Sequence, residues 1–196
     1  MDETKVPSAS TGRSKLVGIT LAALCAALIA VGTFISIPVP MSPVPIVLQN
    51  MFAILAGLLL GPLWGGIAVA LYLVIGALGA PVFAGAKGGM AIILGPTGGY
   101  LLGYLLAAIV GGLIAGTPQA GKKTPLWRLA IATGVAILVI YVPGLLRLNM
   151  VYEGNWTKTF ATGFLPFIIG DILKGIVAAL VSLRVRSTVG DLYQSA

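Results

Sequence analysis

Six apolar stretches alternate with short polar segments along this chain. They cover residues 16–36, 46–60, 63–79, 91–115, 127–146 and 163–183. Because a helix of about 20 residues rises about 30 Å, the thickness of the bilayer hydrocarbon, each block is interpreted as a membrane helix. Only Gly61 and Pro62 separate the second block from the third, which predicts a tight helical hairpin with one arm that need not cross fully. The pattern predicts an all-α membrane protein with six transmembrane helices.

The polar residues at both ends set the expected domain limits. We expect a polar N-terminal tail over residues 1–14, one membrane domain over residues 15–186 and a short C-terminal tail over residues 187–196. A basic start before an apolar block is also how a cleaved signal peptide begins, but the first block of about 20 residues exceeds the usual signal-peptide core.

Two connecting segments have unusual compositions. Residues 36–45 read SIPVPMSPVP and hold four prolines, so this segment is expected to run extended, either as a lid over a pocket or as a rigid connector. Residues 79–100 hold seven glycines, too many for a helix interior. Irregular backbone at membrane depth is tolerated where it is buried in protein or lines a cavity. The second segment is therefore expected to fold back toward a cavity, carrying Phe83, Lys87 and Tyr100.

The composition supports a membrane protein and sets its orientation. The chain is 58% hydrophobic and 9% charged, with a mean hydropathy of +1.06. The net charge of +7 does not indicate nucleic acid, because the basic residues follow the positive-inside rule. Both termini are predicted to be cytoplasmic, in a multi-pass protein of the cell membrane whose basic side also meets anionic lipid head groups. The expected inner segments hold Lys5, Arg13, Lys15, Lys122, Lys123, Arg128, Arg184 and Arg186, and the outer ones hold Lys87, Arg147 and Lys158.

The shortage of reactive side chains argues against an enzyme. The chain has no histidine, one cysteine and five scattered acidic residues, so a zinc site, a histidine triad and a carboxylate metal centre are not expected. Residues 116–123, GTPQAGKK, almost match a phosphate-binding loop, but Lys123 replaces the required Ser or Thr and no β-strand precedes them. We predict no catalytic residue, no metal and no cofactor, so that any ATP is used by another subunit.

Asp171 and Lys174 are the only charges in the last apolar block. Charged side chains at this depth cost roughly 3 kcal/mol each and are usually functional. At helical spacing the two share a face with Phe167, about 12 and 16 Å along the block. A carboxylate accepts ligand N–H groups and an ammonium donates to a carbonyl, so they form a candidate binding site. The alternatives are an ion pair that joins two helices and a proton relay, for which a second membrane carboxylate is lacking.

Small residues recur at every fourth position of the first block. Gly18, Ala22, Ala26 and Ala30 form one row, and Ala23 and Ala27 form a parallel one. Such rows let two helices approach closely. Spacing alone leaves open whether the partner helix belongs to this chain or to another subunit.

Four segments together resemble a known family. They read PVPIVLQN, GAPVFAGAKGG, LGPTGGYLLGY and GFLPFIIGDILKG, and they resemble the BioY family, the biotin-specific S components of energy-coupling factor (ECF) vitamin transporters. The resemblance covers about residues 16–186. It implies a six-helix S-component fold and a high-affinity biotin-binding subunit that works with a transmembrane coupling subunit and two ATPases.

The resemblance also assigns residues. It implies that Asp171 accepts the ureido N–H groups of biotin, that Lys174 donates to the ureido oxygen, and that Lys87 binds the valerate carboxylate. Substrate-binding roles are further expected for Gln49, Tyr100 and Phe167. The row Gly18, Ala22, Ala26 and Ala30 becomes the expected interface with the coupling subunit.

Two other functional classes compete with this hypothesis. A stand-alone secondary transporter or channel for a small polar solute would normally show an internal repeat or paired broken helices, and no repeat is evident. A membrane enzyme would need more acid and base groups than one membrane carboxylate provides.

Overall fold

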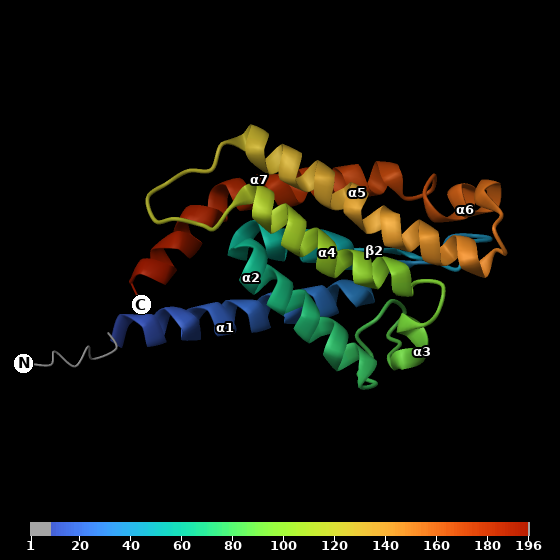
Figure 1. The fold of residues 1–196 in the computed structure, drawn as a ribbon, viewed down its shortest axis with the longest axis horizontal. Coiled ribbons are helices and arrows are strands. Elements are labelled where there is room, and N and C mark those ends of the chain that lie inside the picture. The colour runs from blue at the N-terminus through green and yellow to red at the C-terminus, as the bar shows by residue number, and fades with distance from the viewer. Residues whose placement is uncertain (1–8, 196) are drawn as a thin grey trace, which may run out of the picture.

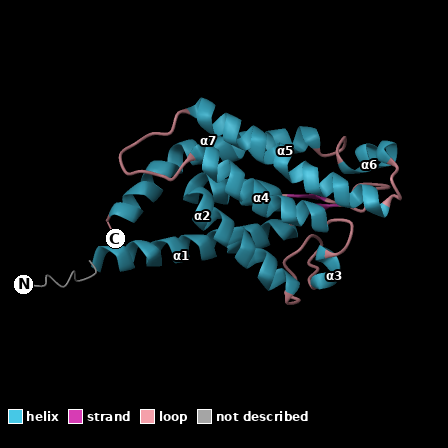
Figure 2. Ribbon diagram, in the orientation of Figure 1, coloured by secondary structure: helices cyan, strands magenta, loops and turns pink. Residues whose placement is uncertain are grey.

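The computed structural model describes residues 9–195, with side chains described from residue 13. Apart from one short ribbon, every regular element in that range is helical (Figure 2), which confirms the all-α prediction. In chain order the elements are α1 (Ala9–Val31), η1 (Gly32–Phe34), β1 (Ser36–Ile37), β2 (Ile46–Val47), α2 (Gln49–Ala77), α3 (Met90–Ile93), α4 (Gly98–Ala115), α5 (Leu126–Val151), α6 (Trp156–Gly163) and α7 (Ile168–Gln194).

The helices long and apolar enough to cross a membrane number four within residues 9–195. They are Arg13–Phe34, Gln49–Ala77, Gly98–Ala115 and Leu126–Val151. Helices α6 and α7, which meet at an angle of 46°, give a fifth span if they are counted together. The structure therefore supports a multi-pass protein with four or five spans, and the count of six stays a prediction.

Helix α2 contains the break that Gly61 and Pro62 predict. Gly61 has φ 78° and ψ −177°, a conformation that residues with a Cβ rarely adopt. Beyond it the chain turns back on itself. The close approach of the two arms shows this: a Cβ on Gly65 would lie 2.6 Å from the Cα of Gly57, eight residues earlier. Residues 49–60 and 62–77 thus pack against each other as the two arms of a bent helix.

The two ends of the molecule differ in character (Figure 1). Both described chain ends lie at one end together with the α4–α5 loop, residues 116–125, and we call this the terminal end. The β ribbon, α3 and α6 lie at the opposite end, which we call the cavity end. This arrangement of the two described chain ends agrees with the prediction that both termini lie on the same side of the membrane. Which side that is stays a prediction.

Helices extend into both predicted tails. Helix α1 begins at Ala9, inside the predicted tail of residues 1–14, while residues 1–8 lie outside the described residues. Helix α7 continues to Gln194 through the predicted C-terminal tail. Its last turns stay helical because Val189 and Gly190 are buried, the glycine against the backbone of residues 119–120.

The cavity end is built from the two unusual connecting segments. Ser36 and Ile37 pair with Val47 and Ile46 in an antiparallel ribbon, which closes the proline-rich segment into a loop without helix. In the glycine-rich segment the Phe83 ring is fully buried, 5.6 Å from the ring of Tyr72. The segment therefore folds back into the protein, as predicted.

The small-residue row of α1 packs inside this chain. Trp64 covers Gly18, and Ala22 and Ala26 are buried, with exposed fractions of 1% and 5%. Ala30 is half-buried and packs against the same core. Most of this row is thus used for the close packing of α1 on α2, and its role as a docking surface for another subunit stays a prediction. The parallel row, Ala23 and Ala27, is the exposed one.

Candidate functional site

A cavity of about 360 Å³ opens at the cavity end. The proline-rich loop and β ribbon contribute residues 36–47, the glycine-rich loop contributes residues 83–87, and residues 92–104 supply the wall at the start of α4. Gln49, the first residue of α2, completes the lining. The segments that the sequence predicted as a lid and as a returning loop therefore enclose one space together.

Two polar groups of this cavity are already engaged by the protein. The Gln49 Nε2 donates to the Val82 carbonyl over 2.8 Å and to the Thr33 hydroxyl, which ties α2 to η1 and the glycine-rich loop. The Tyr100 hydroxyl donates to the Gly163 carbonyl over 2.8 Å. Both side chains are almost fully buried. They shape the wall and hold the surrounding segments together.

Two other polar groups face the cavity without a partner. Within residues 9–195, neither the ammonium of Lys87 nor the hydroxyl of Tyr104 makes a hydrogen bond or ion pair. Lys87 is exposed on the tight turn that pairs the backbones of Phe83 and Lys87, and Tyr104 is 6% exposed. These are the donors that a ligand can use without displacing a protein contact.

Asp171 and Lys174 form an ion pair of 2.8 Å whose hydrogen bonds are satisfied within the protein. One carboxylate oxygen of Asp171 accepts from the Asn50 amide at 2.7 Å, and the other accepts from the Tyr141 hydroxyl at 2.6 Å. The Lys174 ammonium donates to the Val47 carbonyl at 2.8 Å and to the Asn50 amide oxygen at 3.3 Å. Its three protons are thus used, and α2, α5, α7 and the ribbon are joined at one point.

A second, much smaller space lies beside this ion pair. It measures about 30 Å³ and is lined by Asn50, Phe167, Asp171 and Lys174, among others, which is room for a water molecule and little more. Its walls at Val44, Pro45, Val47, Tyr100 and Tyr104 also line the large cavity. The predicted site residues therefore fall into two adjoining compartments, with Gln49 and Lys87 in the large one and Phe167 in the small one.

Sequence reasoning missed three side chains of this region: Asn50, Tyr104 and Tyr141. Asn50 follows Gln49 in the LQN segment. A second polar residue beside a predicted site residue could have indicated that Asn50 also belongs to the site. Tyr104 lies one helical turn after Tyr100, again a readable signal. Tyr141 stands in an ordinary apolar helix. Its ring lies between those of Tyr100 and Phe164, at centroid distances of 6.3 and 4.8 Å.

The described residues contain no group of three His, Cys, Asp or Glu side chains that could hold a metal ion. The polar groups of the two compartments are instead amides, hydroxyls, one ammonium and one ion pair. Such an arrangement can bind a neutral or anionic molecule with hydrogen-bonding groups at its two ends.

Comparison with known proteins places the chain among transporters. The model of the BioY family matches residues 5–191. A protein of Thermotoga maritima named biotin transporter BioY is 45% identical over 166 residues, which cover 84% of this chain and 93% of that protein. The biotin transporter BioY of Rhizobium etli is 38% identical, over 85% of this chain and 91% of that protein.

Solved structures show the same architecture. The crystal structure of the S component for biotin from an ECF-type ABC transporter superposes with a TM-score of 0.78, at 28% sequence identity, over 92% of this chain and 95% of that one. The crystal structure of FolT bound with folic acid has a TM-score of 0.57 at 22% identity, over 87% of this chain and 92% of that one. The second likeness concerns the fold alone.

Proposed function

The chain belongs to the BioY family, and on that basis we propose that it is the high-affinity biotin-binding S component of an ECF-type, ATP-driven uptake transporter. It is a multi-pass membrane protein of a transporter family, and not an enzyme. The observation that carries the proposal is the 360 Å³ cavity closed by the proline-rich and glycine-rich loops. Its volume falls within the range of about 300–1,000 Å³ that is typical of small-molecule sites.

The carboxylate end of biotin is assigned to Lys87. Biotin is a ureido ring fused to a sulfur-containing ring, with a valerate chain that ends in a carboxylate. Lys87 is the one basic side chain that lines the large cavity within the described residues, and its ammonium makes no hydrogen bond or ion pair there. A charge-assisted hydrogen bond to the valerate would give this free ammonium an acceptor.

The ureido end is assigned to Asp171 and Lys174, through an exchange of partners. In the structure the carboxylate accepts an amide N–H from Asn50, and the ammonium donates to the backbone carbonyl of Val47. A ureido group offers the same two functions, N–H and C=O, so that it can replace those contacts like for like. Because the space beside the pair holds only about 30 Å³, this exchange requires the shared wall at Val44 and Pro45 to move aside.

The ureido assignment is tested by binding to purified variants. Asp171→Asn and Lys174→Met are titrated with biotin and with desthiobiotin, which keeps the ureido group but lacks the sulfur. Each variant should bind both ligands at least tenfold more weakly, because one good charge-assisted hydrogen bond is worth about 1.5–3 kcal/mol. Parental affinity in either variant would remove that residue from the site.

The transport step is assigned to partner subunits. The near-match to a phosphate-binding loop at residues 116–123 is an ordinary loop between α4 and α5, so we assign ATP hydrolysis to two ATPases that act through a transmembrane coupling subunit. Because the buried row of α1 is used internally, we place the coupling subunit on the exposed parallel row, Ala23 and Ala27. The termini are then cytoplasmic and the cavity faces outward.

Uptake by reconstituted vesicles separates this function from that of a stand-alone transporter. Proteoliposomes that contain this chain with the coupling subunit and ATPases should accumulate biotin when ATP is enclosed with the ATPases. Vesicles with this chain alone should bind biotin without concentrating it. Rapid uphill uptake by the chain alone, driven by an ion gradient, would contradict the subunit assignment and favour a secondary transporter.

A further inference from the structure

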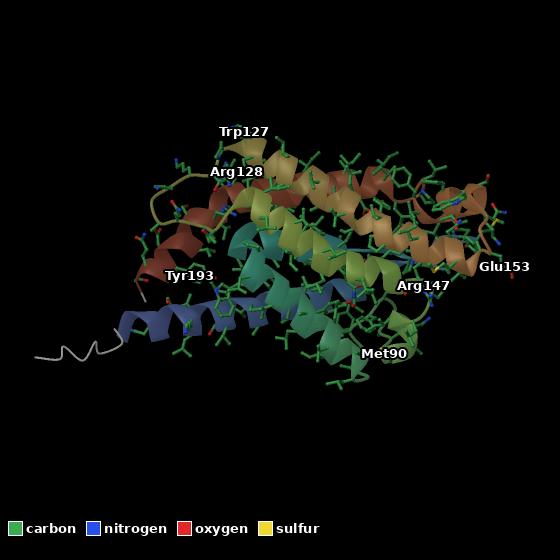
Figure 3. All side chains as sticks on the ribbon, viewed as in Figure 1. Met90, Trp127, Arg128, Arg147, Glu153 and Tyr193 are labelled. Atoms are coloured by element: carbon green, nitrogen blue, oxygen red, sulfur yellow. The ribbon has the colours of Figure 1, made fainter. Side chains whose placement is uncertain are left out.

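The terminal end of the molecule carries a second large cavity, far from the biotin site. It measures about 370 Å³ and is lined by the last residues of α4, the α4–α5 loop and the start of α5, with Arg186 from α7. Its charged lining is entirely basic, and consists of Lys122, Lys123, Arg128 and Arg186. Figure 3 shows Arg128 and Trp127 together at the start of α5.

Arg186 holds this cavity in shape from inside the protein. Its side chain is 2% exposed and donates to the carbonyls of Ala115 and Gly116 over 3.1 and 2.8 Å, and to the Thr124 hydroxyl over 2.9 Å. These bonds link α7 to both ends of the α4–α5 loop. The buried guanidinium therefore contributes a fixed positive charge at the wall, with no carboxylate bound to it among the described residues.

The other basic groups are available to a ligand. The Arg128 Nε donates to the Ile114 carbonyl over 2.6 Å, which leaves its two Nη groups without an acceptor within residues 9–195. Over the same range no hydrogen bond or ion pair involves the ammonium of Lys122 or Lys123. Asp191, the acidic residue at this end among residues 9–195, accepts from the Gly121 N–H over 3.3 Å and is not part of the lining. The cavity thus has an unbalanced positive charge.

An apolar groove lies along the helix that starts beside this cavity. It measures about 330 Å³, runs between α5 and α7, and has a lining of Leu126, Ala130, Gly134, Ile172, Ile176 and Leu180, among others. The two spaces have lining residues that are consecutive in the chain, because Pro125 borders the cavity and Leu126 borders the groove. From Leu126 to Ile137 the groove follows α5 for about 16 Å, which is half the thickness of a bilayer hydrocarbon core.

We propose that the basic cavity and the α5–α7 groove together bind one anionic phospholipid of the leaflet that surrounds the terminal end, the phosphate in the cavity and an acyl chain in the groove. The charges of the cavity complement a phosphate diester, and the groove opens at the surface, where Leu126, Ile172 and Ile176 are about half exposed. A free phosphate would bind in the cavity alone. An acidic protein partner would bind the basic groups without filling an apolar groove one leaflet deep. This inference is independent of the biotin assignment.

Trp127 provides the reporter for a direct test. Its side chain is 66% exposed at the start of α5, next to Leu126 and Arg128. In a Trp64→Phe/Trp156→Phe background it is the only tryptophan. The full chain is placed in phosphatidylcholine nanodiscs that contain a small fraction of brominated phosphatidylglycerol or, in a parallel sample, brominated phosphatidylcholine. Quenching of Trp127 then reports which lipid occupies the site. We expect roughly tenfold enrichment of the anionic lipid, which corresponds to about 1.4 kcal/mol of preference over phosphatidylcholine.

Matched variants separate the site from the general positive charge of this end. Lys122→Gln/Lys123→Gln/Arg128→Gln should abolish most of the enrichment. The control Arg13→Gln/Lys15→Gln/Arg184→Gln removes three charges from exposed positions of the same end and should keep it. Lys122→Gln/Lys123→Gln spares the Arg128 contact and should show an intermediate loss, with an unchanged unfolding temperature.

Two further arms identify the ligand. Gly134→Leu adds a side chain where a Cβ would meet no atom within 4 Å, so it fills the groove without a clash and should lower the enrichment while every charge is kept. Inorganic phosphate in millimolar excess should not displace the lipid. Equal loss in both triple variants, no effect of Gly134→Leu, or displacement by phosphate would overturn the proposal. The proposal would also be overturned if the parent protein showed no enrichment of the anionic lipid and an acidic protein bound to the basic cavity instead.

Discussion

Replacement of Lys87 by methionine should weaken biotin binding through the valerate carboxylate alone. The Lys87 ammonium lines the large cavity and has no partner in the described part of the chain, so that the variant breaks no contact within the protein. Methionine keeps the length and apolar stem of lysine. The lost free energy is that of one charge-assisted hydrogen bond, about 1.5–3 kcal/mol. Because Lys87 is exposed, we expect the lower value, which corresponds to about a tenfold weaker affinity.

The assay compares two ligands in the same protein. Biotin and biotin methyl ester are titrated against the parent and Lys87→Met in nanodiscs, by competition with radiolabelled biotin. The parent should prefer biotin to the ester by about tenfold, and the variant should bind both ligands within about twofold of each other. Lys158→Met is the matched control, because Lys158 lies at the same end but over the Tyr152 ring, 4.4 Å from its centroid. If Lys87→Met weakens the acid and the ester equally, the carboxylate does not contact Lys87 and the reasoning is refuted.

Three further predictions concern the stability of the protein and its assembly with partner subunits. Lys174→Met leaves the buried Asp171 carboxylate without its counter-charge and should lower the free energy of unfolding by about 3–5 kcal/mol. In thermal unfolding, the double variant Asp171→Asn/Lys174→Met should be more stable than Lys174→Met alone. The reverse order of stability would contradict a buried ion pair. Gly18→Leu should destabilise the isolated chain, because Trp64 occupies the space that the new side chain needs. Ala23→Leu should leave the unfolding temperature unchanged but reduce co-purification with the coupling subunit and ATPases. Undiminished co-purification of Ala23→Leu would instead favour the row of Gly18, Ala22, Ala26 and Ala30 as the interface.

The sequence predicts the fold well where a local signal exists. The apolar blocks locate the long helices, and Gly61 with Pro62 locates the break in α2, because backbone chemistry there is local. The helix ends were less predictable. Residues 187–194 lie beyond the last apolar block, yet they remain helical because Gly190 packs against the α4–α5 loop and Val189 packs against α1 and α2, tertiary contacts that no local pattern shows.

The pairing of Asp171 with Lys174 was predictable from the sequence, but the residues that complete their network were not. The three-residue spacing of Asp171 and Lys174 correctly predicts one helix face and a possible ion pair, which the structure shows at 2.8 Å. Asn50 and Tyr141 complete the network from helices 121 and 30 residues away in sequence, and a distant partner leaves no periodic signal. Likewise, the small-residue row of α1 indicates close packing without indicating which helix packs there.

Equilibrium binding of labelled biotin to the purified chain, without any ATPase subunit, tests the central claim most directly. The parent should bind one biotin per chain, and Ala84→Trp, which places a bulky ring in the wall of the 360 Å³ cavity, should lose binding without a lower unfolding temperature. Saturable binding that survives Ala84→Trp, or no binding by the stable parent, would contradict a biotin site in this cavity.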